Sequence, residues 1–262
     1  MKPELDFAGR QIRGTRKTQD DSYSFCPLSS SADGFDGLLL VLADGMGGYE
    51  GGSLASSLVV EAFIEHFCHA RGSIPSRLFG SMRASERRLH EEIARGDESL
   101  SKMGSTLLGI VWTPNQLHWV SVGDSGLYLY QGKTVRRLNA DHSMAPLLEA
   151  KADRGEISRQ TAANHPDRGA LRSAVAIGPL ELYELRDIPF RLEEEAIVIA
   201  ATDGLNSIGS ETMNETVESN YNQTAEQMTC DLLKRVDEAE KKHQDNTTVA
   251  VIRNSVTPEL ES

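Results

Sequence analysis

The sequence predicts an α+β fold in which two packed antiparallel sheets are flanked by helices. Strand-like apolar segments make up much of the chain, several are joined by hairpin-like turns, and the helical stretches come in two pairs. A run of strands interrupted by helix pairs is typical of packed sheets, whereas a parallel sheet needs strand and helix to alternate.

The predicted strands are segments rich in apolar, β-branched or aromatic residues between turn residues. They are Asp6 to Ile12, Ser22 to Cys26, Gly37 to Ala43, Ser105 to Trp112, Leu117 to Val122, Leu127 to Gln131, Val135 to Leu138, Tyr183 to Phe190, Ile197 to Thr202 and Thr247 to Arg253. Short turns at 113–115 and 131–133 predict hairpins between neighbouring strands.

Apolar residues at helical spacing predict two helix pairs. The first pair is Ser53 to Ala70 with Ser76 to Arg95, and the second is Ser210 to Ser219 with Thr224 to Lys242. The segment Met144 to His165 breaks the strand rhythm with a small helical insert, which we expect to act as a lid.

The length of 262 residues suits one domain, which we expect over residues 1–253, with a C-terminal tail over 254–262. The longest apolar runs, Leu38 to Ala43 and Ala196 to Ala201, are far shorter than the roughly 20 residues that span a bilayer. The N-terminus has no apolar core of a signal peptide. Three widely spaced cysteines fit free thiols in a reducing compartment. We therefore expect a cytoplasmic protein without membrane insertion.

The charge balance argues against nucleic-acid binding. The chain has 39 acidic and 27 basic side chains, a formal net charge of −12, and no basic block stands out. Such a surface repels phosphate backbones.

Four aspartates lie where strand-like runs begin or end. Asp44 follows LLLVLA, Asp124 follows WVSVG, Asp203 follows AIVIAAT, and Asp245 comes just before NTTVAVI. A single aspartate at a strand end is usually a turn residue. Four of them in one domain indicate strand ends that converge on hard cations, because Mg²⁺ and Mn²⁺ prefer oxygen ligands.

Two other motifs have simpler explanations. The segment Gly45-x-Gly47-x-x-x-Gly51 is one residue too long for a dinucleotide fingerprint, and a parallel crossover does not follow it. Gly132-Lys133-Thr134 matches the end of a phosphate-binding loop, but Leu127 stands where its first glycine is needed, so a hairpin turn explains it better.

An ordered set of short motifs runs from Arg13 to Val251. They are Arg16-Lys17-Thr18-Gln19-Asp20-Asp21, Asp44-Gly45-Met46-Gly47-Gly48, Gly104-Ser105-Thr106, Gly123-Asp124-Ser125, Asp141-His142-Ser143, Thr202-Asp203-Gly204-Leu205 and Asp245-Asn246-Thr247-Thr248. The set resembles the type 2C metal-dependent protein serine/threonine phosphatases, and in particular the bacterial members. The resemblance implies an α+β fold, a four-layer α-β-β-α sandwich of two antiparallel sheets flanked by pairs of helices, with Mn²⁺ or Mg²⁺ at one end.

The resemblance also implies roles for individual residues. Asp44 would bridge two ions, the Gly45 carbonyl would contribute to one of them, and Asp203 and Asp245 would hold the other. Asp124 together with Asp203 would form a weaker third site.

Further roles follow from the N-terminal motif. Asp20 and Asp21 would act on the ions directly or through ordered water. Arg16 would face the phosphoryl oxygens, where a guanidinium can donate two hydrogen bonds. His142 is expected to be a loop or packing residue, since the expected ions do not need imidazole.

Some positions depart from the family pattern. Gln19-Asp20 replaces the usual Asn-Glu, and Met46 stands where eukaryotic relatives carry a histidine proposed as general acid. Gly126 replaces the arginine usual after Gly-Asp-Ser, and Asn206 replaces a common aromatic after Asp-Gly-Leu. None of these changes removes an expected core ligand.

We therefore predict hydrolysis of phosphoserine and phosphothreonine in proteins by a water activated between two divalent cations. Such an enzyme would be a soluble, monomeric partner of a serine/threonine kinase, and a flap-like insert at about 141–178 would border its active site. The alternative is an inactive pseudophosphatase that binds phosphoproteins without turnover. It would need a lost core carboxylate, whereas Asp44, Asp203 and Asp245 are all present.

Overall fold

The computed structural model describes residues 1–47, 51–175, 178–193 and 195–254. Gly48 of the glycine-rich motif and nearly all of the expected tail lie outside these residues. The helices within the described ranges include none with the length and apolar character needed to cross a membrane.

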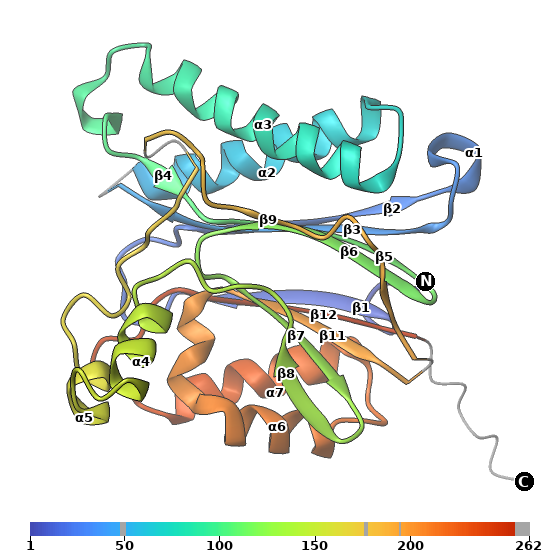
Figure 1. Cartoon of the computed structure of the whole chain (residues 1–262). Coiled ribbons are helices and arrows are strands. Elements are labelled where there is room, and N and C mark those ends of the chain that lie inside the picture. Colours follow the sequence, from blue (N-terminus) through green and yellow to red (C-terminus); the bar gives the residue numbers. More distant parts are fainter. Residues whose placement is uncertain (48–50, 176–177, 194, 255–262) are drawn as a thin grey trace, which may run out of the picture.

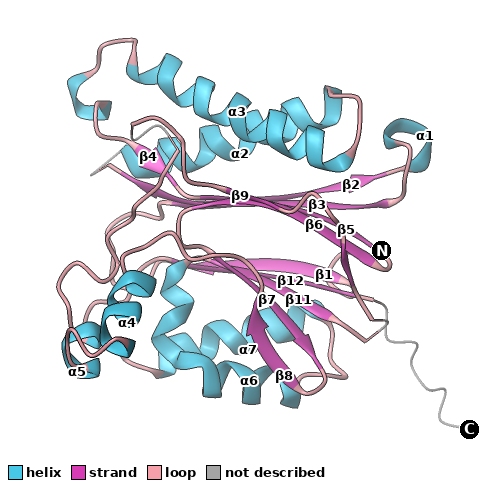
Figure 2. Cartoon of the chain, viewed as in Figure 1, coloured by secondary structure: helices cyan, strands magenta, loops and turns pink. Residues whose placement is uncertain are grey.

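Two sheets stack face to face between two layers of helices, which confirms the predicted sandwich (Figures 1 and 2). One sheet has five strands in the order β1 (Phe7–Ile12), β12 (Thr247–Arg253), β11 (Ile197–Ala201), β7 (Gly126–Gln131) and β8 (Thr134–Arg137). The path through the other runs β10 (Phe190–Arg191), β6 (Gln116–Val122), β5 (Leu107–Thr113), β3 (Gly37–Met46) and β2 (Asp21–Leu28), with β4 (Gly104–Ser105) beside β3 and β9 (Glu184–Leu185) beside β6. The paired strands of both sheets run antiparallel.

The helices form the outer layers in the predicted pairs. α2 (Gly51–His69) and α3 (Ile74–Ile93) cover the sheet of β3, and α6 (Gly209–Ser219) and α7 (Ala225–Glu238) cover the sheet of β11 (Figure 1). Shorter elements are α1 (Ser30–Asp33), α4 (Ala145–Asp153), α5 (Arg159–Ala163) and the 3₁₀ helices η1 (Glu98–Leu100) and η2 (Asp203–Ile208). The expected helical insert corresponds to α4 and α5, which lie together at one end of the sandwich.

Three of the expected elements differ in the structure. The strand predicted from Ser105 to Trp112 is divided into β4 and β5 at Thr106, whose N–H and hydroxyl bond the backbone of Asp44. The single strand predicted from Tyr183 to Phe190 is two short strands, β9 and β10, because Pro189 cannot donate to a sheet ladder and Ile188 turns outward, with 68% of its surface exposed. The helix predicted to reach Lys242 ends at Glu238, and Glu240 has a positive φ of 45° that no helix accommodates.

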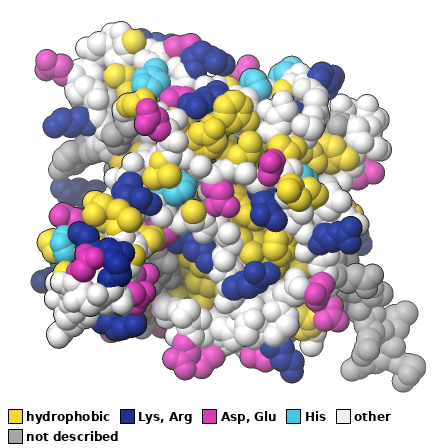
Figure 3. All heavy atoms as spheres, viewed as in Figure 1, with side chains coloured by type: hydrophobic (Ala, Val, Ile, Leu, Met, Phe, Trp, Pro, Cys, Tyr) yellow, Lys and Arg dark blue, Asp and Glu magenta, His cyan; other side chains and the backbone are white. Residues whose placement is uncertain are grey.

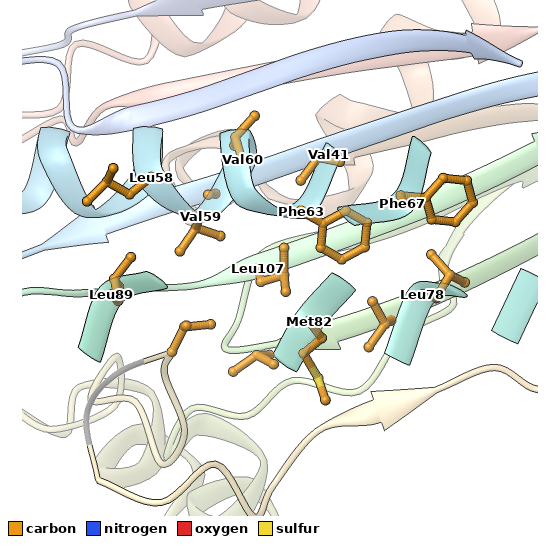
Figure 4. Close-up of a cluster of buried hydrophobic side chains, with 14 of the residues drawn as sticks. Val41, Leu58, Val59, Val60, Phe63, Phe67, Leu78, Met82, Leu89 and Leu107 are labelled. Carbon is orange, nitrogen blue, oxygen red and sulfur yellow. The ribbon is translucent and has the colours of Figure 1, made fainter. Parts of the chain in front are cut away.

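Three apolar clusters hold the layers together. One lies between α2, α3 and their sheet, where Val59, Phe63 and Leu78 are fully buried (Figure 4). A second fills the space between the sheets, and a third lies under α6 and α7. Strand residues alternate between clusters: Leu127 and Leu129 point between the sheets, while Tyr128 and Tyr130 point toward the helices. This core fixes the strand ends from which the acidic side chains project.

The surface agrees with the charge pattern of the sequence. On the face drawn in Figure 3, lysine and arginine side chains are interspersed with aspartate and glutamate.

The three cysteines form no disulfide with one another: Cys26, Cys68 and Cys230 are all thiols. The sulfur atoms of Cys26 and Cys68 lie 3.6 Å apart.

Candidate metal centre

A cavity of about 520 Å³ opens between segments that are far apart in the sequence. It is lined by five aspartates together with glycines, an arginine pair and part of the insert: Arg16, Asp20, Asp44, Gly45, Met46, Gly47, Thr106, Asp124, Gly169, Leu171, Arg172, Ser173, Ala174, Asp203, Asp245 and Asn246. All of the expected site residues except Asp21 therefore line one cavity.

Asp44 is held rigidly by its own backbone. Its N–H donates to the Thr106 hydroxyl at 2.9 Å, and its carbonyl accepts from the Thr106 N–H at 2.8 Å and the Ser105 hydroxyl at 3.0 Å. The Thr106 hydroxyl also bonds Ser125, next to Asp124, at 2.8 Å. The Gly104-Ser105-Thr106 motif thus connects two of the acidic segments.

Gly45 lies where the chain comes closest to itself. Its N–H donates to the Asp20 carbonyl at 3.0 Å, and an added Cβ would overlap the carbonyl oxygen of Gly52 at the start of α2. A Cβ on Gly52 would in turn lie 3.0 Å from the Asp20 carboxyl carbon. These glycines allow Asp20, Asp44 and the helix start to meet.

Asn246 fastens the N-terminal loop to the turn of Asp245. Its side-chain amide donates to the carbonyls of Arg13 and Thr18, each at 2.9 Å, and its oxygen accepts from the Asp20 N–H at 2.8 Å.

Asp245 accepts a hydrogen bond from the Arg16 guanidinium on one carboxylate oxygen. Its other oxygen accepts from the Asn246 N–H at 2.8 Å. Arg16 therefore lines the cavity, and its described partner is a carboxylate.

Asp21 lies behind the cavity. It is opposite Asp44 in the β2–β3 pairing, is only 4% exposed, and accepts hydrogen bonds from Thr202 at 2.9 Å and Thr248 at 2.7 Å. These contacts join β2 to β11 and β12, so Asp21 supports the segments that carry Asp203 and Asp245.

Burial and neighbouring like charges raise the pKa values of several carboxylates in the site. Burial is the main cause that raises the pKa of Asp44 well above its usual range, and the charges of Asp21, Asp203, Asp124 and Asp245 add to it. Burial also raises the pKa of Asp124 to about 7, with Asp203 contributing. Like charges that cannot all ionise without a counter-charge are typical of a cation site.

Burial also raises the pKa values of Asp21 and Asp203. Burial, opposed by hydrogen bonds from Thr248 and Thr202, raises the pKa of Asp21 to about 7. Burial and then the charge of Asp245 raise the pKa of Asp203 to about 6, while Arg16 lowers it.

The donor atoms suit a hard cation, but they are not yet arranged as a finished ligand set. Buried oxygens of Asp20, Asp21 and Asp203 have no hydrogen-bond partner. Over the ranges that the structure describes, however, no group of three or more His, Cys, Asp or Glu is placed so that it could hold an ion. Asp245 already accepts hydrogen bonds from Arg16 and from the Asn246 N–H, so an ion bound there would compete with these donors.

Two neighbouring residues differ in their access to the cavity. His142 is buried behind it and accepts the Gly123 N–H on its Nδ1 at 3.3 Å, in agreement with a packing role. Met46 lines the cavity and offers a thioether, which has no acidic proton.

Some residues at the cavity carried no recognisable signal in the sequence. Arg172 comes from the insert and is held by its own Nε–H, which donates to the Ser143 carbonyl at 2.9 Å. Thr106 and Asn246 lie within the motifs Gly104-Ser105-Thr106 and Asp245-Asn246-Thr247-Thr248, but the sequence does not predict their hydrogen bonds with Asp44 and Asp20.

Comparisons with known proteins agree with this geometry. The family described as Protein phosphatase 2C matches residues 8–246. The serine/threonine phosphatase stp of Listeria welshimeri is 28% identical over 183 residues, which is 68% of this chain and 71% of that protein.

Solved structures have the same fold. The serine/threonine phosphatase PstP/Ppp of Mycobacterium tuberculosis superposes with a TM-score of 0.78 at 26% identity, covering 96% of this chain and 99% of the other. A PstP catalytic domain in complex with two manganese ions has a TM-score of 0.73 at 25% identity, covering 94% and 96%. With a family match across nearly all of the sequence and the expected sandwich around an acidic cavity, the chain belongs to the protein phosphatase 2C family of protein serine/threonine phosphatases.

Proposed function

We propose that this phosphatase hydrolyses phosphoserine and phosphothreonine in proteins with the help of two divalent cations, Mn²⁺ or Mg²⁺. The observation that carries the proposal is the convergence of five aspartates, from five separate segments, on one cavity. Asp44, the Gly45 carbonyl, Asp203 and Asp245 would hold the two core ions, Asp20 and Asp21 would support them, and Asp124 with Asp203 would hold a weaker third. When bound, such ions lower the pKa of water and neutralise charge on a phosphoryl group.

The residues of the chain would divide the remaining tasks. Arg16 would leave Asp245 and donate hydrogen bonds to the phosphoryl oxygens, and its exposed guanidinium can make this exchange without unfolding its loop. Asp21, fixed by two threonines, would keep Asp203 and Asp245 in register. Because Met46 has no acidic proton, the proton for the leaving oxygen would come from solvent in the cavity.

The insert would select substrates. Residues 169 and 171–174 line the cavity, so a bound phosphoprotein would lie close to them. We propose that the protein reverses the action of a serine/threonine kinase and that it works as a monomer, which light scattering after gel filtration would test.

The decisive experiment is hydrolysis of p-nitrophenyl phosphate and of a phosphothreonine peptide over a range of Mn²⁺ and Mg²⁺ concentrations. We expect turnover that rises with either ion, falls to background in EDTA, and is lost in Asp44→Asn. No turnover at any concentration of either ion, with the peptide still bound, would instead support the pseudophosphatase alternative.

A further inference from the structure

Two residues from distant parts of the chain meet at the ring of a tyrosine. They are Gly126, the first residue of β7, and Asn206, which lies in η2. Both contact the side chain of Tyr128: the ring lies over Gly126, and the hydroxyl donates to the Asn206 side-chain oxygen at 3.3 Å. The two residues therefore belong to one local arrangement around Tyr128.

The ring of Tyr128 uses the space that a side chain at position 126 would need. The two residues are two apart on β7, so they face the same side of the sheet. A Cβ on Gly126 would lie 2.5 Å from Cζ and from the hydroxyl oxygen of Tyr128, which is far inside contact distance. The missing side chain is thus a condition for the observed position of the ring.

The hydroxyl of Tyr128 connects the two turns that carry acidic residues. Asn206 lies in η2, whose first residue is Asp203. Gly126 begins β7, two residues after Asp124. Tyr128 therefore spans from the Asp124 turn to the Asp203 turn.

A guanidinium still reaches the Asp124 turn, from the next strand. Arg137 is opposite Tyr128 in the β7–β8 pairing. It donates to the Asp124 carbonyl at 2.8 Å and to the Asp141 carboxylate at 3.3 Å. With Arg137 holding one side of the turn, Tyr128 is left to set its distance from η2.

We propose that Tyr128 is a positioning residue that sets the placement of Asp124 relative to Asp203, through its ring on Gly126 and its hydroxyl on Asn206. This inference rests on the proposed function, in which these two aspartates share a cation. A correctly spaced pair binds the cation more tightly, so the hydroxyl contributes to cation affinity without touching substrate.

The first test compares Tyr128→Phe, Asn206→Ala and the double variant. Mn²⁺ binding is measured by calorimetry, and the Mn²⁺ concentration for half-maximal activity by kinetics. Each single variant should weaken Mn²⁺ about 3- to 10-fold, as expected for one lost hydrogen bond, with little change in kcat at saturation. The double variant should bind Mn²⁺ no more weakly than the weaker-binding single variant. Losses of Mn²⁺ affinity that add up in the double variant would overturn the proposal.

Tyr130→Phe is the matched control. Tyr130 is on the same strand and the same side of the sheet, but its ring packs on Tyr221 at 5.9 Å, away from the acidic turns. Its loss of a hydroxyl should leave Mn²⁺ affinity unchanged. An equal loss of affinity in this variant would show that any change in β7 has the effect, which would also overturn the proposal.

The second test does not depend on activity. In EDTA, Gly126→Ala should lower the melting temperature of the protein, whereas the same change combined with Tyr128→Ala should add nothing to the effect of Tyr128→Ala alone. Equal effects of Gly126→Ala in both backgrounds would refute the ring contact. If Mn²⁺ fails to activate the enzyme but this coupling is present, the proposed function fails and the ring contact stands.

Discussion

The Arg16 guanidinium donates a hydrogen bond to the carboxylate of Asp245, so the expected phosphate-binding cation and an expected metal ligand neutralise each other. The pair is partly exposed, with 60% of the arginine side chain and 37% of the aspartate side chain accessible. Exposed ion pairs of this kind are worth only about 0 to 1 kcal/mol. A phosphoryl group and a divalent cation can therefore replace the two partners at little loss.

This relationship predicts the effect of Arg16→Ala. Removing a charge-assisted hydrogen bond to the phosphoryl group should lower kcat/KM for a phosphothreonine peptide by about 10- to 150-fold, which corresponds to about 1.5 to 3 kcal/mol. Arg16→Lys should have a kcat/KM between those of the wild type and Arg16→Ala, because an ammonium keeps the charge but cannot form the planar bidentate contact. Steady-state kinetics at saturating Mn²⁺ measures both.

Arg10→Ala is the control for this prediction. Arg10 also pairs with an acidic residue, Glu226, but on the outer side of the sandwich beside β1 and α7. Its replacement should leave kcat/KM within about twofold of the wild-type value. Unchanged kinetics in Arg16→Ala would remove Arg16 from the phosphate site.

The crowding of carboxylates predicts that Asp44→Asn separates stability from activity. The buried Asp44 carboxylate has neighbours of like charge, and the amide of asparagine removes its share of that repulsion. We expect the variant to melt at a higher temperature than the wild type in EDTA at pH 7.5. We also expect its activity to fall more than about 100-fold, since replacing even a residue that only hydrogen-bonds a metal ligand lowers metal affinity or activity about 10- to 100-fold. An active variant, or one that melts lower in EDTA, would contradict a cation role for Asp44.

The raised pKa values predict how stability changes with pH when divalent cations are chelated. The pKa values of Asp21 and Asp124 are about 7 and that of Asp203 is about 6 in the folded chain, against about 3.9 for an unfolded aspartate. Between these limits the folded state binds more protons, so the free energy of unfolding falls as pH rises from about 4 through about 7. Melting temperatures in EDTA should therefore decrease from pH 5.5 to pH 8.

Saturating Mn²⁺ should flatten or reverse this slope, because the cation stabilises the ionised carboxylates. The variant Asp203→Asn supplies the control, since it lacks one of the groups concerned and should show a weaker decrease in EDTA. A melting temperature that is constant or rises over this pH range in EDTA would mean that the carboxylates are not crowded as described.

The strands and helices could be predicted from the sequence because their signals are local. The strand expected at Thr247 to Arg253 has these bounds in the structure, and Gly51–His69 contains nearly all of the helix expected at Ser53 to Ala70. Alternation and helical spacing report which face of a segment is buried, and the core satisfies that pattern directly. Local breaks, such as Pro189 in the strand expected from Tyr183 to Phe190, were missed, and so were the short helices α1, η1 and η2.

The site was predictable as a set of residues but not as a set of contacts. The acidic strand ends were visible, and Asp44, Asp124, Asp203 and Asp245 do line one cavity. The pair of Arg16 with Asp245 joins segments at opposite ends of the chain. Periodicity and spacing contain no information about such contacts, because they depend on which strands pair. Here β1, which precedes Arg16, lies beside β12, which follows Asp245.

The close approach at Gly45 predicts that even a methyl group will disturb the centre. A Cβ there would overlap the Gly52 carbonyl and lie 2.8 Å from the Asp20 carbonyl, and both neighbours are backbone that cannot rotate away. Gly45→Ala should therefore lower the free energy of unfolding by about 1 to 3 kcal/mol, as overpacking does, and weaken activation by Mn²⁺. Urea denaturation and Mn²⁺ titration measure the two effects.

Gly169→Ala is the matched control, because Gly169 lines the same cavity and an added Cβ there would meet open space. Equal behaviour of the two variants would show that the contact between the Asp44 strand and the start of α2 is not as tight as the structure has it.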